Sequence, residues 1–275
     1  MSTYDRIEEM RKLWNSRNKK SKFGFISYLQ PGQEWDSAEF HLTGIRFVDR
    51  MVERFCDYGE VETSYASILE IGCGVGRFLK PLGCRFRKVT GVDVSKNMLK
   101  TAKKYCACLP NVSFVQNDGS SLAPIPDSTY DYCVSAGVFQ HITDMAVILD
   151  YIREALRILK PRGVFLFQFE GNRTGATGVQ DVGAKITASG LDEGLRDCSF
   201  IIKEVSIDSR DAVRNIVAVI KKEPGAEVAL DDRSFQKFSM TERRWITGVY
   251  DDITTKTSMH ERQKSPPLAL TFYDQ

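Results

Sequence analysis

The chain has 275 residues, long enough for one sizeable α/β domain with extensions or for two small domains. With 42% hydrophobic and 27% charged residues, its composition is ordinary for a globular protein. The formal net charge of +2 excludes a strong global attraction to nucleic acid or to an anionic membrane.

The N-terminal segment is charged and lacks the apolar core of a signal peptide, and no stretch approaches the ~18 apolar residues that suggest a membrane helix. The seven cysteines are an odd number without framework spacing. Cys106 and Cys108 form a C-x-C pair, but no second pair or nearby His completes a zinc set. We therefore expect reduced thiols, a cytoplasmic location, no membrane insertion and no metal.

Two helices are predicted before the first strand. The first covers residues 3–18, and its apolar positions are Ile7, Met10, Leu13 and Trp14. A loop with Gly, Pro and Gln follows over residues 23–35. The second helix is predicted from Asp36 or Ser37 to Tyr58, with one broad apolar stripe formed by Phe40, Ile45, Phe47, Val48, Met51, Val52 and Phe55.

From Tyr65 the pattern changes to strands that alternate with helices. Strands are predicted at 66–71, 88–94, 111–118, 130–136 and 163–170. A helix over 144–160 ends at the stop signal Lys160-Pro161-Arg162-Gly163. Such alternation implies crossover connections and a parallel sheet. Residues 199–207 and 214–221, joined by a short polar link, predict an antiparallel hairpin at the edge of this sheet.

A glycine cluster stands where the first strand meets its helix, in the sequence Glu70-Ile71-Gly72-Cys73-Gly74-Val75-Gly76-Arg77. Ligands of such sheets bind beyond the carboxyl ends of the strands. Glycines there permit a tight turn and a close approach of the ligand to the backbone. A dinucleotide site has the spacing G-x-G-x-x-G, whereas this sequence has G-x-G-x-G. The spacing alone leaves an adenosyl ligand, a dinucleotide and a ligand-free turn open.

Two further acidic positions follow at the ends of the next two strands. Asp93 can accept both hydroxyl groups of a ribose. Its alternative role as a helix cap is already filled by Ser95. In Asp118-Gly119-Ser120 a carboxylate can accept from an adenine amino group, and an Asx turn is the alternative. Three such sites at three consecutive strand ends are harder to explain as ligand-free turns than a single site would be.

Together these residues resemble the class I S-adenosylmethionine-dependent methyltransferases, in particular the small-molecule enzymes of that family. The resemblance covers about residues 61–222 and depends on the segments ILEIGCGVGRFL, GVDVSKNML, NDGSSL, YDYCVSAGVFQHI and REALRILKPRGVFLF. It implies an α/β fold with a Rossmann-like, doubly wound, seven-stranded sheet of order 3-2-1-4-5-7-6, in which strand seven is antiparallel. Residues 1–60 would form an N-terminal helical lid, 61–224 the methyltransferase domain and 225–275 a C-terminal extension.

The resemblance also implies a cofactor and its contacts. S-adenosylmethionine would be the methyl donor and S-adenosylhomocysteine the product. The residues expected around it are Glu70, Gly72, Cys73, Gly74 and Gly76 at the methionine part, Asp93 at the ribose, Val94, Met98, Asp118, Gly119 and Ser120 near the adenine, and Ala136 and Gln140 on the sulfonium side.

Methyl transfer from a sulfonium is an in-line displacement, to which proximity and alignment contribute much of the acceleration. A base is needed only when the acceptor must lose a proton. His141, just after the fourth strand, is the first candidate because its unperturbed pKa lies near neutrality. A histidine that shapes this loop is the alternative. Glu170, at the end of the fifth strand, is the second candidate base and can instead hold an acceptor hydroxyl.

Aromatic residues outside the sheet are candidates for covering the site. Tyr28, Trp35, Phe40 and His41 precede the first strand, and Trp245 and Tyr250 follow the last. The N-terminal group can enclose the sulfonium by cation–π contact or pack as a lid without touching a ligand. The C-terminal pair can cover the same mouth or serve an oligomer interface, and the sequence leaves the oligomeric state undecided, a homodimer included.

The expected function is methyl transfer to an oxygen or nitrogen atom of a small molecule or glycan. The segment SAGVFQH lacks the Asn/Asp-Pro-Pro-Tyr signature of amino-methylating enzymes, and Cys133 lacks the neighbouring Pro of a cytosine-C5 nucleophile. Nucleic acid is therefore not the expected partner. The alternatives are an RNA or protein methyltransferase steered by the basic residues of 11–22, and a non-catalytic protein that retains the cofactor site. The identity of the acceptor stays undecided.

Overall fold

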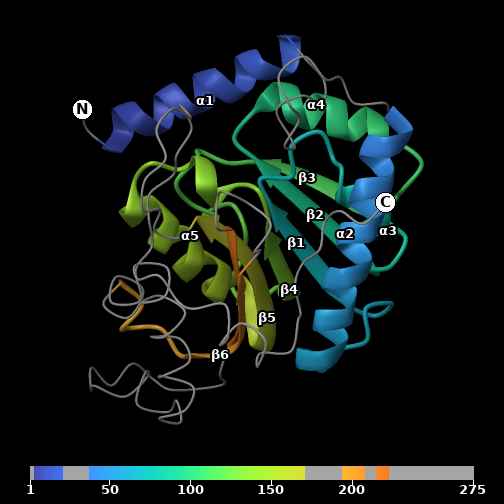
Figure 1. The fold of residues 1–275 in the computed structure, drawn as a ribbon, viewed down its shortest axis with the longest axis vertical. Coiled ribbons are helices and arrows are strands. Elements are labelled where there is room, and N and C mark those ends of the chain that lie inside the picture. The colour runs from blue at the N-terminus through green and yellow to red at the C-terminus, as the bar shows by residue number, and fades with distance from the viewer. Residues whose placement is uncertain (1–2, 21–36, 171–193, 208–214, 223–275) are drawn as a thin grey trace, which may run out of the picture.

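The computed structural model describes residues 3–20, 37–170, 194–207 and 215–222. Its strands form a sheet of order β3-β2-β1-β4-β5-β7-β6 (Figure 1). The strands are β1 (Ser67–Ile71), β2 (Lys88–Asp93), β3 (Val112–Gln116), β4 (Tyr130–Ser135), β5 (Leu159–Glu170), β6 (Phe200–Ile207) and β7 (Asn215–Lys222). Strands β1 to β5 pair in parallel, and β7 pairs antiparallel with both β5 and β6. The predicted order and the edge hairpin are confirmed.

Helices cover both faces of the sheet. They are α1 (Thr3–Lys20), α2 (Ser37–Tyr58), α3 (Leu79–Gly83), α4 (Lys96–Tyr105) and α5 (Met145–Ile158), with a 3₁₀ turn η1 (Phe139–His141). One face packs against α2, α3 and α4, and the other packs against α5 and η1. Because apolar cover lies on both faces, the central strands are buried throughout, as their near-continuous apolar sequences predict. Helix α1 runs across the end of this layered structure (Figure 1).

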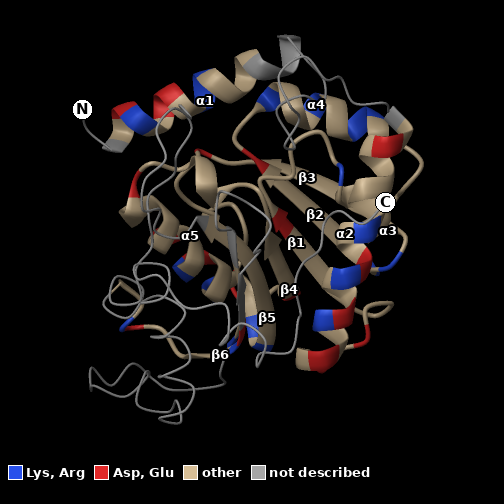
Figure 2. Cartoon of the chain, in the orientation of Figure 1, with Lys and Arg blue, Asp and Glu red and all other residues tan. Residues whose placement is uncertain are grey.

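The polar and apolar sides of the helices follow from their sequences. In α4, Met98, Leu99 and Ala102 are buried, whereas the lysines lie on the outside, where Figure 2 shows basic residues along the helix. Ser95 caps α4, since its Oγ accepts from Met98 N at 3.2 Å, as predicted. Two predicted apolar-face positions are wrong: Leu13 and Ile45 are each 41% exposed.

The end of α5 and the start of β5 differ from the prediction. The helix ends at Ile158 rather than residue 160, and β5 begins at Leu159 rather than residue 163. Leu159 pairs with Tyr130, and the pairing then shifts until Tyr132 meets Val164. Pro161 has no backbone N–H to donate to a ladder, and Arg162 has a φ of 67°. The Lys-Pro-Arg-Gly segment is therefore an irregularity within a strand, not the end of a helix.

A buried ion pair joins α2 to the edge of the sheet. Arg54 Nε lies 3.0 Å from Glu204 Oε2, and Arg54 Nη2 lies 3.0 Å from Glu204 Oε1. Tyr58 OH also donates to Glu204, at 3.3 Å. The register of β6 against β7 shifts between Ile202 and Glu204. The Arg54 and Glu204 side chains are only 6% and 8% exposed. Removing either partner would therefore leave the other charge buried without compensation.

None of the described helices has the length and apolarity needed to cross a membrane. All seven cysteines are free: Cys73, Cys106 and Cys133 are buried, Cys198 is half-buried, and Cys56, Cys84 and Cys108 are exposed. The predicted C-terminal extension, 225–275, lies outside the described residues, as do Tyr28, Trp35, Trp245 and Tyr250.

Candidate functional site

The glycine-rich loop joins the ends of three strands. After β1, the backbone N–H groups of Gly72 and Cys73 donate to Val92 O of β2, at 2.7 and 3.0 Å. Gly72, Gly74 and Gly76 have φ angles of 71°, 53° and 90°, a region that favours glycine. A Cβ at Gly72 would lie 2.3 Å from the Val138 side chain, in the loop after β4. The glycines therefore permit a turn that brings these three strand ends together.

Asp93, the last residue of β2, holds this loop in place. Its Oδ2 accepts from Gly74 N at 2.8 Å and its Oδ1 accepts from Ser95 N at 2.8 Å. Burial raises the pKa of Asp93 to about 6, although these two hydrogen bonds act in the opposite direction. Each carboxylate oxygen retains a second lone pair. The group can therefore fix the loop and still accept hydroxyl hydrogen bonds.

Glu70 in β1 is a buried acid, with only 3% of its surface exposed. Its Oε2 has no hydrogen-bond partner among the described residues, and neither has the buried Oγ of Ser135 at the end of β4. Burial raises the pKa of Glu70 to about 8; the Asp93 charge adds to this and the Arg77 guanidinium opposes it. Unpaired buried acceptors are costly. A cationic or hydrogen-bond-donating ligand near these atoms would relieve that cost.

The third strand end contains the Asx turn that sequence reasoning gave as an alternative. Asp118 Oδ1 accepts from Ser120 N at 2.8 Å and from Ser121 N at 2.9 Å. Burial acts to raise the pKa of Asp118, but these hydrogen bonds outweigh it and the pKa lies below its ordinary value. Asp118 is exposed, so the turn does not remove it from reach of a ligand.

Asn117 was missed by sequence reasoning. Its buried amide Nδ2 donates to Ser121 O at 2.9 Å and lies 2.7 Å from Tyr151 OH of α5. These bonds tie the loop after β3 to the helix beneath it. The only signal in the sequence was its place directly before Asp118.

The residues predicted near an adenine separate into two groups. Gly119 has a φ of 94°, and a Cβ there would lie 3.1 Å from both Val94 Cγ2 and Ile7 Cγ2. Val94 and Gly119 thus lie together under α1. Met98 instead packs with Phe40 and Val75, in a small buried cluster against which Trp14 also packs. Ser120 is half-buried within the Asx turn.

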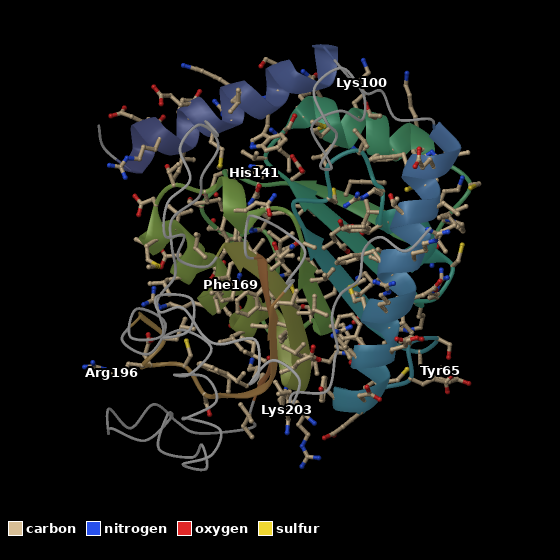
Figure 3. All side chains as sticks on the ribbon, viewed as in Figure 1. Tyr65, Lys100, His141, Phe169, Arg196 and Lys203 are labelled. Atoms are coloured by element: carbon tan, nitrogen blue, oxygen red, sulfur yellow. The ribbon has the colours of Figure 1, made fainter. Side chains whose placement is uncertain are left out.

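The loop after β4 carries the candidate base. Gly137 N donates to Gln168 Oε1 of β5 at 3.1 Å, a contact that sequence reasoning did not find. His141 Nε2 lies 3.3 Å from Gln140 Nε2, and the His141 ring meets Trp14 edge to face, with centroids 5.1 Å apart. Figure 3 shows His141 below α1.

The remaining predicted residues of this side are less informative. Ala136 is half-buried and packs against the core under α2. Glu170 is the last residue of β5, opposite Asn215 of β7, and its side chain lies outside the described residues. Among the described residues, no three His, Cys, Asp or Glu side chains are grouped so that they could hold a metal ion.

The start of α2 covers the glycine-rich loop. Phe40 is fully buried against Val75 and Met98, and a Cβ at Gly44 would lie 2.5 Å from Arg77 O. His41 stacks on Tyr105 of α4, with centroids 4.2 Å apart, and burial lowers its pKa. Both aromatic side chains therefore pack on protein.

Comparison with known proteins identifies the central domain. Residues 69–167 match the family model described as a methyltransferase domain. The chain is 36% identical over 112 residues to malonyl-[acyl-carrier protein] O-methyltransferase of Halalkalibacterium halodurans, covering 39% of this chain and 40% of that protein. It is 33% identical over 103 residues to demethylmenaquinone methyltransferase of Staphylococcus aureus, covering 35% of this chain and 39% of that protein.

A solved structure shares the fold over more of the chain. It is phosphoethanolamine N-methyltransferase 1 of Haemonchus contortus, in complex with phosphoethanolamine and S-adenosylhomocysteine, with a TM-score of 0.61 and 15% identity. The match covers 92% of this chain and 55% of that one. The class is thus that of methyltransferase-type α/β proteins. More specifically, the matched segment, residues 69–167, is a methyltransferase domain of the class I S-adenosylmethionine-dependent type, and the chain spans only about 40% of the length of the sequence relatives that it matches.

Proposed function

We propose that this protein transfers the methyl group of S-adenosylmethionine to an oxygen or nitrogen atom of a small molecule or glycan. The observation that carries the proposal is the arrangement at the ends of β1 and β2. A buried carboxylate at Asp93 and a buried, unpaired acceptor at Glu70 flank a turn whose glycines keep side chains away from the backbone. The relatives named above act on chemically different acceptors. They therefore support methyl transfer as the reaction but favour no particular acceptor.

The donor fits the residues present. Asp93 would accept from the ribose hydroxyls with its free lone pairs, and Glu70 with Ser135 would face the positive charge of the methionine part. Val94, Gly119 and Asp118 would hold the adenine. When bound, S-adenosylmethionine supplies an activated methyl group on a sulfonium. In this proposal residues 1–60 form the cover, and the chain excludes water by packing α1 and Phe40 over the strand ends.

His141 is the proposed base. With the donor bound, the acceptor atom would receive the methyl group, and His141 would take the proton that the acceptor loses. In the structure Nε2 lies within hydrogen-bond distance of the Gln140 amide and Nδ1 is buried. An acceptor would have to displace that amide from Nε2. Glu170, at the end of β5, is the second proposed contact for an acceptor hydroxyl.

The first experiment is a binding measurement followed by a turnover screen. We expect calorimetry to detect S-adenosylmethionine binding to the full chain. Labelled methyl donor is then offered with malonyl thioesters, quinols, phosphorylated amines and glycans, with RNA and protein substrates as further arms. Binding without transfer to any acceptor would favour the non-catalytic alternative, and transfer confined to RNA or protein would overturn the small-molecule proposal.

For His141→Ala we expect cofactor affinity to change little and turnover to fall by ~10²-fold, because removal of a general base typically costs this much. The measurement is single-turnover kinetics at saturating S-adenosylmethionine with the acceptor found in the screen. Full turnover in the variant would eliminate His141 as the base and leave the loop-shaping alternative.

A further inference from the structure

Helix α1 is attached to the sheet domain at both of its ends. In its C-terminal half, Asn15 Oδ1 accepts from Ser95 Oγ at 2.9 Å, and Asn15 O accepts from Asn97 Nδ2 at 2.9 Å. These bonds, here named the Asn15 clasp, join α1 to the first residues of α4. Near its other end, Arg6 lies 3.6 Å from Asp144, the cap of α5. Figure 1 shows α1 running from the α5 side to the α4 side.

One face of α1 is directed at the candidate site. Ile7, Met10 and Trp14 share this face, since residues three, four and seven apart line up on a helix. Ile7 and Met10 lie against Gly119, and Trp14 lies against His141. The same helix therefore touches the predicted adenine position and the proposed base.

Trp14 meets the imidazole in a defined geometry. The two ring planes make an angle of 69° at a centroid distance of 5.1 Å, and both residues are half-buried. Edge-to-face pairs of this kind are favourable enough to change the population of a side-chain orientation by a few-fold to ~10-fold. On another side, Gln140 Nε2 lies 3.3 Å from the imidazole Nε2.

We infer that Trp14 is a positioning residue for His141, and that the Asn15 clasp keeps α1 docked so that Trp14 can act. The inference rests on the proposed function, because it assigns Trp14 to the orientation of the proposed base. Trp14 transfers no proton. It restricts the imidazole to the orientation from which His141 can take the acceptor proton. The clasp bonds directly to the segment that follows Asp93. Helix α1 therefore both covers the donor and orients the base.

The first test reads the ring contact without any acceptor. The chain has three histidines, so the ring signals of His141 can be assigned by their loss in His141→Gln. In the full chain saturated with S-adenosylhomocysteine, we expect ring-current-shifted His141 signals that move toward random-coil positions in Trp14→Leu and stay displaced in Trp14→Phe. Leu13→Ala, at an exposed neighbour, is the matched control. Unchanged His141 signals in Trp14→Leu would overturn the inference.

The second test asks whether Trp14 acts through His141. At saturating donor, we expect Trp14→Leu to lower kcat by ~10-fold, Trp14→Phe to restore most of it, and Trp14→Leu to cause no further loss in a His141→Ala background. Losses that multiply in the double variant would reject the positioning role. The proposed function fails separately, if the unaltered protein binds the donor and methylates nothing.

The clasp has its own matched pair of variants. Asn15→Ala removes the side-chain bond to Ser95, whereas Ser16→Ala removes a bond to Leu13 O within α1 itself. We expect Asn15→Ala to shift the His141 signals in the same direction as Trp14→Leu and to speed release of S-adenosylhomocysteine, with Ser16→Ala unchanged. His141 signals that are identical in both variants would show that the clasp does not hold Trp14 in place.

Discussion

The glycine-rich loop and the helical cover are built from contacts of very different range along the chain. In the loop, Asp93 bonds to Gly74 and Ser95, which lie 19 and 2 residues away. In the cover, the Asn15–Ser95 bond spans 80 residues and the Arg54–Glu204 pair spans 150. A short motif can therefore encode the first region, whereas the second exists only once the sheet has formed. Variants in the loop should therefore change donor binding, whereas variants in the cover should change stability and the orientation of the base.

The largest expected effect belongs to the cover and concerns stability alone. Arg54→Ala leaves the Glu204 carboxylate buried without its main partner, and such a loss typically costs ~3–5 kcal/mol of the free energy of unfolding. We expect this in urea unfolding of the full chain.

Two further variants test the cause of that loss. Replacing both partners, as in Arg54→Met with Glu204→Leu, should recover most of the stability because no charge remains buried. Arg162→Gln, at a pair with Glu60 that is largely exposed, should change stability by less than ~1 kcal/mol. If the double variant is as unstable as Arg54→Ala, packing rather than charge explains the effect.

The next effect belongs to the loop and concerns the donor. Asp93→Ala removes hydrogen bonds from a charged acceptor, each worth ~1.5–3 kcal/mol, so we expect S-adenosylmethionine affinity to fall by ~10²-fold or more. Circular dichroism should show the fold retained, and Asp150→Ala, at an exposed residue of α5, is the control. Calorimetry that finds the affinity of Asp93→Ala unchanged would eliminate its ribose role.

A smaller effect concerns pH. The pKa of Glu70 rises from its ordinary 4.5 to about 8 on folding and that of Asp93 from 3.8 to about 6, so the folded chain holds more protons than the unfolded chain between these values. Without ligand, the free energy of unfolding should therefore fall as pH rises, by ~2–3 kcal/mol between pH 6 and 8. The slope should shrink in Glu70→Gln, because the uncharged amide does not titrate.

The same linkage predicts the pH dependence of binding. A cationic donor favours the Glu70 carboxylate, so affinity should increase from pH 6 to 8 with release of protons. Calorimetry in buffers of different ionisation enthalpy measures that release. Equal slopes for the unaltered protein and Glu70→Gln would show that Glu70 is not the titrating group.

What could be predicted from the sequence also differs between the short-range contacts of the loop and the long-range contacts of the cover. The edge hairpin, the Ser95 cap and the clustering of Glu70, Asp93 and the glycines were predicted because each depends on local patterns, whereas the strand order was predicted from the family resemblance. The start of β5 was wrong because the proline that reads as a helix stop lies within an irregular strand. The contacts of Asn15 with Ser95, Trp14 with His141 and Gln168 with Gly137 could not be predicted, since no periodicity records which distant segments meet.

The smallest expected effect lies where the two regions meet. Ser95 Oγ accepts from Met98 N as the cap of α4 and donates to Asn15 Oδ1 of the cover. Ser95→Ala should therefore cost ~1–2 kcal/mol of the free energy of unfolding, a cap plus one further bond, whereas Asn15→Ala should cost less. In a double-mutant cycle by urea unfolding, we expect a coupling of at least ~0.5 kcal/mol between the two. Strict additivity would mean that α1 is held by other contacts, and the cover would then be independent of the donor loop at Ser95.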